Sequence, residues 1–419
     1  MMWFESQKKR LIGVYQEYPR PFWTLVGVTF IDHLGGALLF PFFALYITSK
    51  FGVGMTEVGL LFAVFSISSF AGSFLGGALS DRMGRKGILI FSLISTSISS
   101  ILMGLVNSLS AFFLLALVVG VFTDTGGPAR QAMVADLLPE EKRAQGYGII
   151  RVVFNISATL GPAIGGFMAS RSYLMLFIAD AVISLISAFI VWRAMPETKP
   201  EAQPGTPQES MGGTFKGYFL VLRDKLFVLF ISASILMVFV YMNMGTTLGV
   251  YLRDIQGVAE SRYGLILSMN AAMVVLFQFP ITRRIEKLPP MLMMALGSAL
   301  YAVGFAMYGF VSTYTLFLLA MVIITIGEML VAPVGQALVA HFAPEDMRGR
   351  YMAIAGFSYG IPFAIGPLLA GLIMDNTDPR ALWWAAGIIG MMAVSMFMWL
   401  HRKVQREPEA AKIKAGEKA

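Results

Sequence analysis

Long apolar segments recur along the whole chain, and they restrict its possible folds more than any other feature of the sequence. Each is long enough to cross a lipid bilayer as a helix, which takes about 20 residues. Because the bilayer core offers the backbone no hydrogen-bond partners, such segments fold as α-helices. The sequence therefore predicts an all-α membrane protein with twelve transmembrane helices, at approximately residues 22–48, 57–80, 87–106, 110–136, 143–169, 172–193, 226–251, 260–282, 291–311, 314–341, 349–374 and 380–400.

The composition argues against several classes of protein. Hydrophobic residues make up 57% of the chain and charged residues only 14%, which is too apolar for a single soluble core. The net charge of +7 lies in short loops and tails, so we expect no nucleic-acid partner. Because there is no Cys and there are only three His, we expect no metal site. No glycine-rich phosphate-binding loop is present, and nothing else indicates an enzyme or a cofactor.

The distribution of Lys and Arg predicts how the chain is oriented. If the segments alternate in direction, one set of loops and both tails carry 25 of these residues, and the other loops carry five. Positive residues accumulate on the cytoplasmic side. We therefore expect both termini in the cytoplasm and a multi-pass protein of a bacterial plasma (inner) membrane. The polar N-terminal stretch does not resemble a cleaved signal peptide, so we expect the first apolar segment to direct insertion.

One long polar connection, Met195–Lys225, divides the segments six and six. It contains four Pro and several Gly, a composition typical of a linker. We expect an N-terminal six-helix bundle at 1–193, a cytoplasmic linker at 194–225, a C-terminal six-helix bundle at 226–401 and a cytoplasmic tail at 402–419. The end of the linker, Thr214–Lys225, has the pattern of a short amphipathic helix on the membrane surface.

The two halves repeat at a constant offset of 205 residues. Pro128 matches Pro333, and Gly161 matches Gly366. Parallel repeats of this kind are typical of secondary transporters, in which the substrate site lies near the membrane midplane. The offset therefore predicts two pseudo-symmetric bundles.

A short, basic, glycine-containing turn, Gly77–Lys86, joins the second and third segments. It reads Gly-Ala-Leu-Ser-Asp-Arg-Met-Gly-Arg-Lys and resembles motif A of the major facilitator superfamily. The resemblance implies the major facilitator fold, a monomer, and a cytoplasmic latch. In this latch Arg85 pairs with Asp136, and Asp81 faces the start of the eleventh helix near Arg348–Tyr351. The simpler alternative is that the cations only set the topology. The residues of the implied latch are Gly77, Asp81, Arg82, Gly84, Arg85, Lys86 and Asp136.

The fifth segment carries a second motif. Small residues recur every four positions from Ser157 to Ala169, which predicts a face where another helix packs closely. Packing alone explains this face, but part of it also resembles motif C, the antiporter motif of drug:proton exchangers in the superfamily. The resemblance implies antiport and a seal between the two halves on the outer side, through Gly161, Pro162, Gly165 and Gly166.

Acids inside apolar segments are candidates for proton coupling, since a charge is costly there. Four lie in the predicted helices: Asp32, Asp124, Asp180 and Glu328. In the superfamily the helices that would hold Asp32, Asp124 and Glu328 line the cavity. Asp180 lies on a supporting helix, and we interpret it as structural.

Two arginines, Arg130 and Arg151, lie inside the fourth and fifth segments at similar depth. A buried Arg stays charged and needs a carboxylate, which Asp32 or Asp124 can supply. Such a pair is a static brace or a switch, and the sequence does not decide between them. Motif B of the superfamily places an Arg earlier in the fourth helix, where this chain has none.

Other polar residues are candidates to line a pliable, mostly apolar cavity together with some of the 28 Met and 33 Phe. Glu328 resembles the acidic position of some multidrug antiporters, which implies contact with cationic substrates. The other candidates for the cavity are Asn155, Tyr241, Asn243, Asn270 and Gln278.

We interpret the chain as a proton-coupled secondary transporter that exports lipophilic, cationic small molecules by alternating access. The expected partners are the substrate, protons and the bilayer. Asp32 and Glu328 are the residues expected to carry the coupling, and the sequence does not say which of them takes the proton. Two alternatives stay open: a metabolite transporter for a sugar or lysolipid, and a non-transporting receptor or scaffold on the same fold.

Overall fold

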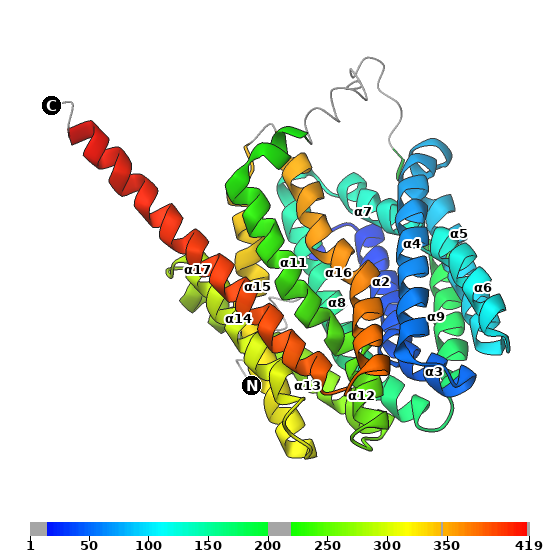
Figure 1. Ribbon diagram of the computed structural model, residues 1–419. Helices are drawn as coiled ribbons and strands as arrows, with labels where there is room; N and C mark the ends of the chain where they lie inside the picture. The colour runs from blue at the N-terminus through cyan, green and yellow to red at the C-terminus, as the bar shows by residue number, and fades with distance from the viewer. Residues whose placement is uncertain (1–14, 200–218, 345–346, 417–419) are drawn as a thin grey trace, which may run out of the picture. The chain divides into compact units, whose positions relative to one another are not determined.

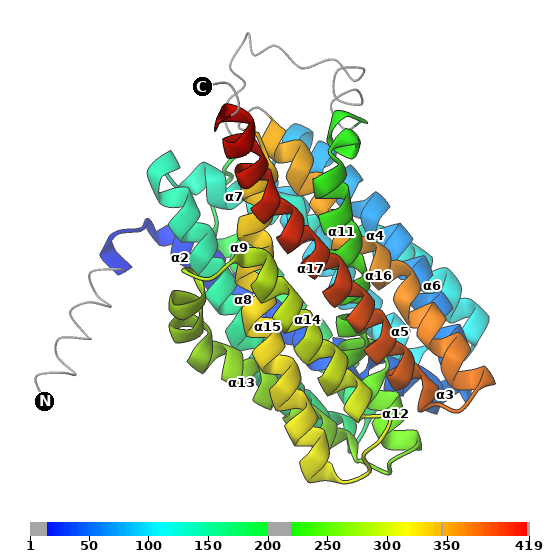
Figure 2. The same cartoon turned by 60° about the vertical axis from the view of Figure 1, so that its left-hand side comes forward.

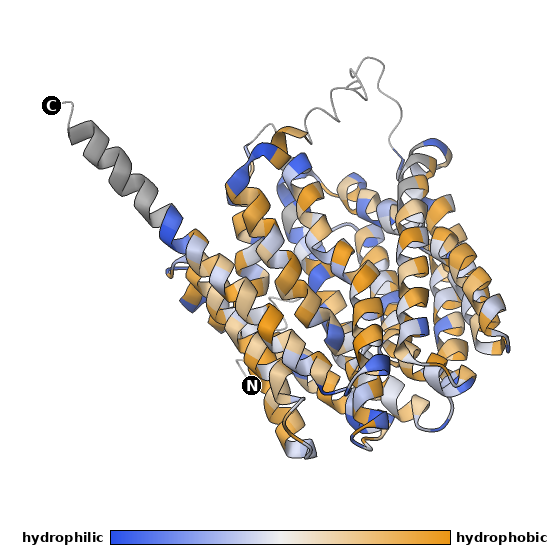
Figure 3. Cartoon of the chain, in the orientation of Figure 1, coloured by the Kyte–Doolittle hydropathy of each residue, from blue (hydrophilic) through white to orange (hydrophobic). Residues whose placement is uncertain are grey.

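The computed structural model describes residues 15–199, 219–344 and 347–416, and every regular element in these ranges is helical (Figure 1). Hydrophobic residues cover most of the length of the helices, and hydrophilic residues gather toward their ends (Figure 3). The all-α prediction is therefore confirmed, with most helix ends within a few residues of those expected. In the described part of the chain, twelve helical spans are long and apolar enough to cross a membrane: Arg20–Phe51, Met55–Gly77, Arg85–Leu105, Leu109–Leu137, Glu140–Ala169, Tyr173–Ala194, Lys225–Thr246, Glu260–Ile285, Pro290–Met307, Tyr314–Phe342, Arg350–Asn376 and Ala381–Lys403.

The helices pack as two units. Of the described residues, the first contains 15–43 and 64–199, and the second contains 44–63, 219–344 and 347–416. Helix α4 (Met55–Met83) is shared, because its first residues, to Ala63, belong to the second unit. The first unit otherwise holds α2 (Arg20–Leu39), η1 (Phe40–Phe42), α5 (Arg85–Leu105), α6 (Leu109–Thr123), α7 (Gly126–Leu137), α8 (Glu140–Ala169) and α9 (Tyr173–Ala194).

In the first unit, α2 packs against α8 and α9, and α5 packs against α9. A buried apolar cluster joins α2, α5, α7, α8 and α9. Elsewhere small residues bring helices close together, as is usual where lipid removes the hydrophobic drive for packing. A Cβ atom on Gly76 of α4 would lie 2.3 Å from the carbonyl oxygen of Thr125, so these backbones touch.

The second unit contains the remaining helices. In it, α14 packs against α15 and α17, which run alongside it in both views, and α11 packs against α16 and α17 (Figures 1 and 2). Helix α17 continues into residues predicted to form a tail. The helices are α3 (Phe43–Phe51), α11 (Lys225–Thr246), α12 (Leu248–Asp254), α13 (Glu260–Ile285), α14 (Pro290–Met307), α15 (Tyr314–Phe342), α16 (Arg348–Asn376) and α17 (Ala381–Gly416).

Three of the predicted segments are broken helices. The first changes at η1, the fourth at Asp124–Thr125 and the seventh at Thr247. At the fourth, the Ser92 hydroxyl donates a hydrogen bond to the carbonyl oxygen of Thr123 at 2.5 Å. This bond satisfies a carbonyl that the break releases, as an apolar environment requires. The tenth segment corresponds to the fourth in the repeat, so the repeat predicts the same shape for both. The tenth nevertheless forms one continuous helix, α15, that passes through Pro333.

The repeat extends to backbone conformation. Gly52 follows α3 with φ +64°, and Gly257 follows α12 with φ +63°. The two positions are related by the same offset of 205. Neither has a neighbour within 4 Å of an added Cβ atom, so the left-handed backbone alone explains why both are glycine.

The linker is described only in part. Residues 214–218 of the predicted amphipathic helix lie outside the described ranges, and Phe219–Arg223 are helical. That helix stops before Lys225, because Asp224 caps the next one. Its Oδ1 accepts hydrogen bonds from the backbone N–H groups of Leu226 and Phe227, both at 3.1 Å, at the start of α11.

The turn between the second and third helices is shorter than predicted. Helix α4 runs to Met83 and α5 begins at Arg85, so Gly84 alone separates them, with φ +106°. The residues Gly77–Lys86 were expected to form the turn. A positive φ that favours glycine allows one residue to reverse the chain, so the residues before it continue the helix.

The predicted small face of α8 packs against α2. A Cβ atom on Gly161 would lie 2.4 Å from the Cβ atom of Ala37, and one on Gly165 would lie 2.4 Å from the carbonyl oxygen of Leu38. One turn earlier, the Ser157 hydroxyl donates to the carbonyl oxygen of Phe30 at 3.1 Å. The prediction of close packing is confirmed, while a role of this face in antiport stays a prediction.

This contact predicts an asymmetry between neighbouring positions. Gly165→Leu should abolish folded protein, because even its Cβ atom overlaps the α2 backbone and overpacking costs about 1–3 kcal/mol or more. Leu160→Ala should be mild, since the Leu160 side chain is 43% exposed. The yield of monodisperse protein in detergent and its thermal unfolding midpoint measure both effects. Equal tolerance at the two positions would show that α8 and α2 are not in close contact.

Candidate functional site

A carboxylate lies in a cavity of the second unit. Glu328 on α15 accepts hydrogen bonds from the Tyr241 hydroxyl on α11 at 3.0 Å and from Asn270 Nδ2 on α13 at 2.8 Å. Asn270 Nδ2 also donates to the Thr325 hydroxyl, one turn before Glu328, at 2.9 Å. Each carboxylate oxygen thus has one neutral donor. Hydrogen bonds of this kind hold the carboxylate in place without a partner of opposite charge.

The cavity around Glu328 has a volume of about 490 Å³ and is lined from α11, α14, α15 and α16. The rings of Tyr241 and Tyr301 stack in it with centroids 5.4 Å apart. Among the described residues that line the cavity, Glu328 is the one charged side chain. Such a cavity offers an apolar, aromatic surface with one negative group. The large apolar and aromatic side chains of the lining include Phe230, Met237, Met294, Tyr301, Met352 and Tyr359.

The other residues expected in a cavity behave differently. Asn243 is buried, and its Nδ2 donates to the carbonyl oxygen of Phe239 on its own helix at 2.9 Å. Gln278 Nε2 donates to the carbonyl oxygen of Met329 at 3.0 Å. Neither residue lines this cavity, and each amide is held instead by a backbone carbonyl. Asn155 lies on α8, in the first unit.

The first unit contains a partly buried ion pair. Arg130 Nη2 on α7 lies 2.5 Å from Asp32 Oδ2 on α2, and the two side chains are 14% and 18% exposed. Of the two acids considered for Arg130, the structure selects Asp32. Arg130 Nε is buried and has no hydrogen-bond partner among the described residues, so the guanidinium is only partly satisfied. Removing one partner of such a pair leaves an uncompensated charge in an apolar environment.

The remaining ionisable candidates are more dispersed. Asp124 is exposed at the break between α6 and α7, and Arg151 on α8 is exposed rather than buried as expected. Asp180 on α9 is only 5% exposed and accepts a hydrogen bond from the Ser100 hydroxyl on α5. This arrangement agrees with the structural role expected of Asp180.

Sequence reasoning missed two groups of residues near these acids. The ring of His33, next to Asp32 in the chain, lies 3.8 Å from the ring of Phe154 between centroids. Its adjacency to Asp32 was a signal that could have been used. Tyr301 and Tyr359 line the Glu328 cavity, but one aromatic residue among many in an apolar segment carries no such signal.

A comparison with known families decides the identity of the fold. The model of the Major Facilitator Superfamily matches residues 25–259 and 232–419, which together cover nearly the whole chain. The chain belongs to the major facilitator superfamily. It is therefore a membrane transporter, in agreement with the twelve apolar helical spans in the described residues.

Relatives within the superfamily differ in the substrates that their names give. A Na(+), Li(+), K(+)/H(+) antiporter of Planococcus maritimus is 27% identical over 95% of this chain and 96% of its own. The quinolone resistance protein NorA of Staphylococcus aureus is 24% identical over 86% and 91%. The crystal structure of the nucleoside transporter NupG has a TM-score of 0.76 at 14% identity, over 91% of this chain and 99% of that one, a likeness of fold alone.

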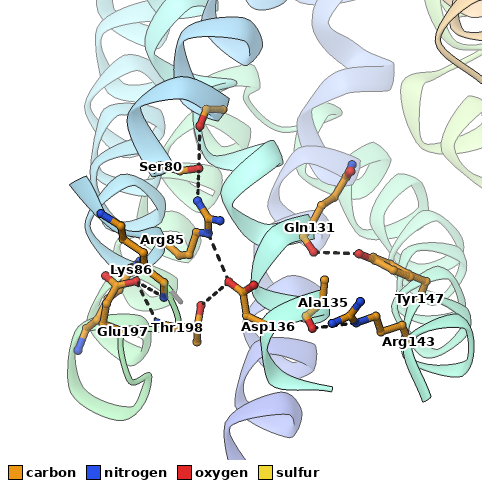
Figure 4. Close-up of polar contacts among 12 residues, drawn as sticks. Ser80, Arg85, Lys86, Gln131, Ala135, Asp136, Arg143, Tyr147, Glu197 and Thr198 are labelled. Atoms are coloured by element: carbon orange, nitrogen blue, oxygen red, sulfur yellow. Dashed lines mark hydrogen bonds and ion pairs between the residues drawn. The ribbon is translucent and has the colours of Figure 1, made fainter. Parts of the chain in front are cut away.

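The residues that resemble motif A of the superfamily lie where α4 meets α5. Arg85 points toward Asp136 on α7, with 3.3 Å between Nε and Oδ2, and its Nη1 donates to the Ser80 hydroxyl at 3.3 Å (Figure 4). The side chains of Arg85 and Asp136 are 11% and 13% exposed, so water screens the pair only weakly. The predicted contact between Arg85 and Asp136 is confirmed.

Glu197, just beyond α9, completes this junction and was not singled out from the sequence. Its carboxylate accepts hydrogen bonds from the backbone N–H groups of Arg85 at 2.8 Å and Lys86 at 3.2 Å. Helix α5 has Gly84 at its N-cap and no side-chain cap of its own, so Glu197 caps it from a distant segment. A Cβ atom on Gly84 would lie 2.4 Å from Glu197 Oε2, a second reason for glycine there.

The ionisation of Glu197 reflects these bonds. Burial opposes the charged form, but backbone N–H groups of Lys199, Arg85, Lys86 and Thr198 outweigh it and lower the pKa of the Glu197 carboxyl below its ordinary 4.5. The Thr198 hydroxyl also donates to Asp136 Oδ2 at 3.3 Å. The start of the linker thus bonds both to the first residues of α5, through Glu197, and to Asp136, through Thr198.

The rest of the implied latch is only partly described. The side chains of Asp81 and Arg348 lie outside the described part of the structure, so their contact stays a prediction. Gly77 lies within α4, and the carbonyl oxygen of Arg82 accepts a hydrogen bond from Lys199 Nζ at 2.8 Å. Nearby, α7 and α8 are joined by two side chains that donate to backbone carbonyls (Figure 4): Tyr147 to Gln131 at 3.1 Å and Arg143 to Ala135 at 3.0 Å.

The lowered pKa makes the Glu197 contribution to stability depend on pH. Because the folded-state pKa is below 4.5, the contribution is complete above that pH and is lost as pH falls through the folded value. Glu197→Gln should therefore lower the thermal midpoint at neutral pH, by the equivalent of about 1 kcal/mol for a lost cap. The difference from the wild type should shrink in acid. Glu140→Gln, in the first turn of α8, is the matched control, and a gap of equal size there would contradict the specific cap.

Proposed function

We propose that the chain exchanges protons for lipophilic, cationic small molecules and exports them by alternating access. The observation that carries the proposal is the single carboxylate of Glu328 in a mostly apolar, aromatic cavity of about 490 Å³. An organic cation gains from such a site in two ways. Its charge meets the carboxylate, and its apolar parts meet aromatic faces, which also attract cations.

Proton coupling follows from competition for the same negative charge. A protonated Glu328 no longer attracts a cation, and a bound cation keeps Glu328 ionised. Because linkage is reciprocal, protons weaken binding of the substrate by the same factor as the substrate weakens binding of protons. This is antiport in thermodynamic terms. The similarity to NorA, named for quinolone resistance, supports export of drug-like molecules.

Asp32 supplies the second coupling element of the proposal. Protonation of Asp32 would remove the negative charge that lies 2.5 Å from Arg130 and leave the guanidinium without a charged partner. The charge of Arg130 would then favour another arrangement of α7, in which Asp124 at the nearby helix break is the available acid. We therefore assign the pair the role of a switch rather than of a static brace.

A second candidate is exchange of alkali cations for protons, because the relative from Planococcus maritimus bears that name. Bare metal cations need several oxygen ligands at once. In the cavity the oxygens of Glu328 already accept bonds from Tyr241 and Asn270, and most of the lining is apolar. The cavity therefore favours the organic cation, and the assay below includes both classes.

Asp32→Asn should abolish uphill, proton-driven transport while keeping detectable substrate binding. The change removes the titrating group but nearly preserves its shape. Transport of ethidium and of Na⁺ into inverted vesicles with an imposed pH gradient measures coupling, and binding to purified protein is measured at two pH values. Asp180→Asn, the same change at the acid interpreted as structural, should keep gradient-driven transport. Wild-type accumulation by Asp32→Asn would remove Asp32 from the mechanism.

Glu328→Gln should weaken binding of cationic substrates selectively. Loss of a hydrogen-bonded charge partner costs roughly 1.5–3 kcal/mol, or about a factor of 10 to 100 in affinity. A neutral substrate of similar shape should lose little. Tyr241→Phe keeps the carboxylate and should give an intermediate loss. Glu260→Gln, at the first residue of α13, should give none, because Glu260 does not line the cavity. Equal losses for cationic and neutral substrates would contradict an electrostatic role for Glu328.

A further inference from the structure

The segment Ala44–Ala63 packs with the second unit, although it lies within the sequence of the N-terminal half. It contains most of α3 and the start of α4. Two polar contacts and a close backbone contact hold it to α12 and α16.

Asp375, near the end of α16, caps the start of α4. Its Oδ1 accepts a hydrogen bond from the backbone N–H of Met55 at 3.0 Å, and its Oδ2 accepts one from Thr56 at 2.7 Å. These N–H groups have no partner within α4, and a negative charge is favourable at the positive end of a helix. A Cβ atom on Gly54 would lie 2.5 Å from Asp375 Oδ2, so the approach also depends on that glycine.

Arg253, at the end of α12, binds α3. Its Nη1 donates to the carbonyl oxygen of Leu45 at 2.9 Å, and its Nη2 donates to the Thr48 hydroxyl at 2.8 Å. Asp254 lies 2.6 Å from Arg253 Nε through Oδ1 and so fixes the plane of the guanidinium. We call the contacts of Asp375 and Arg253 with the segment 44–63 the α4 clasp.

Between these polar contacts the helices meet at their backbones. A Cβ atom on Gly59 would lie 2.3 Å from Leu368 Cα, and one on Gly371 would lie 2.3 Å from the carbonyl oxygen of Met55. At these two glycines the backbones of α4 and α16 are in contact, and beside them the rings of Phe62 and Phe363 meet edge to face, with centroids 6.0 Å apart. When such an interface separates in a membrane, its apolar side chains can contact lipid, but the hydrogen-bonded groups lose their partners, so the polar contacts favour the closed arrangement.

Helix α4 links this interface to the first unit. It is continuous from Met55 to Met83, and its later part packs against α6 and α7 through Gly72 and Gly76. If the two units move as bodies, the start of α4 cannot follow the second unit while the rest follows the first. The clasp must then open, or α4 must bend.

We propose that Asp375 and Arg253 are positioning residues. In one transport state of the protein they hold the segment 44–63 against α12 and α16, and in the other they release it. The proposal rests on alternating access as the proposed mode of function. Hydrogen bonds between a charged side chain and the backbone suit this role. They are strong while formed, and the groups that they release can bind water. Lys50 and Arg253, at the ends of α3 and α12, belong to the part of the chain expected on the outer side, so release would open the protein outward.

Distance measurements test the clasp without a transport assay. The chain has no Cys, so spin labels placed at Leu60→Cys and Leu372→Cys, both exposed, report α4 and α16 without background. In lipid nanodiscs, Asp375→Asn should raise the ratio of separated to closed protein roughly tenfold, since it removes the charge from two hydrogen bonds. Asp375→Glu should restore much of the closed population. Arg253→Gln and Thr48→Val should shift the ratio in the same direction.

Asp378→Asn is the matched control, because it removes a carboxylate close to Asp375 that accepts a bond from Arg380 instead. It should leave the distances unchanged. Wild-type distances in both Asp375→Asn and Arg253→Gln would overturn the clasp, as would an equal shift in Asp378→Asn. The distance measurements do not depend on the vesicle assay of Asp32→Asn, which tests proton coupling. Failure of the clasp and failure of the proposed function are therefore distinguishable.

Discussion

Polar groups inside the apolar layer of a membrane can be satisfied only by other parts of the protein. The contacts described above follow from that constraint. The Ser92 hydroxyl takes up a carbonyl released by the broken fourth span, Asp32 neutralises Arg130, and Tyr241 and Asn270 hold Glu328. In each case a polar side chain of one helix compensates a group of another.

The sequence predicts the helices well because their signal is length and hydropathy, which do not depend on neighbours. It also predicts the Arg85–Asp136 contact, through the resemblance to motif A, and the small face of α8, through a regular spacing. Asn270 and Tyr241 were expected to line a cavity, and the structure places them on Glu328.

Several of the errors share one physical cause. Asn243 and Gln278 were expected to face a cavity, but backbone carbonyls hold their amides, and a sequence does not show which of several partners an amide takes. Glu197 was overlooked because its partners are backbone N–H groups, which nearly every residue has, so the sequence does not mark them. The same holds for Asp375 on α4. Contacts between side chains and backbone depend on tertiary position and leave no pairwise pattern to read.

The paired glycines Gly52 and Gly257 have a consequence for how this chain tolerates mutation. Both have open space around them, so any side chain would fit, and the left-handed backbone is the sole restriction. That restriction is worth roughly 1–2 kcal/mol for most other residues. In a library of random variants the two sites should therefore show matching substitution profiles, with Asn the least harmful replacement at each. Two loops 205 residues apart in the sequence would thus be under the same constraint, because they have the same backbone conformation.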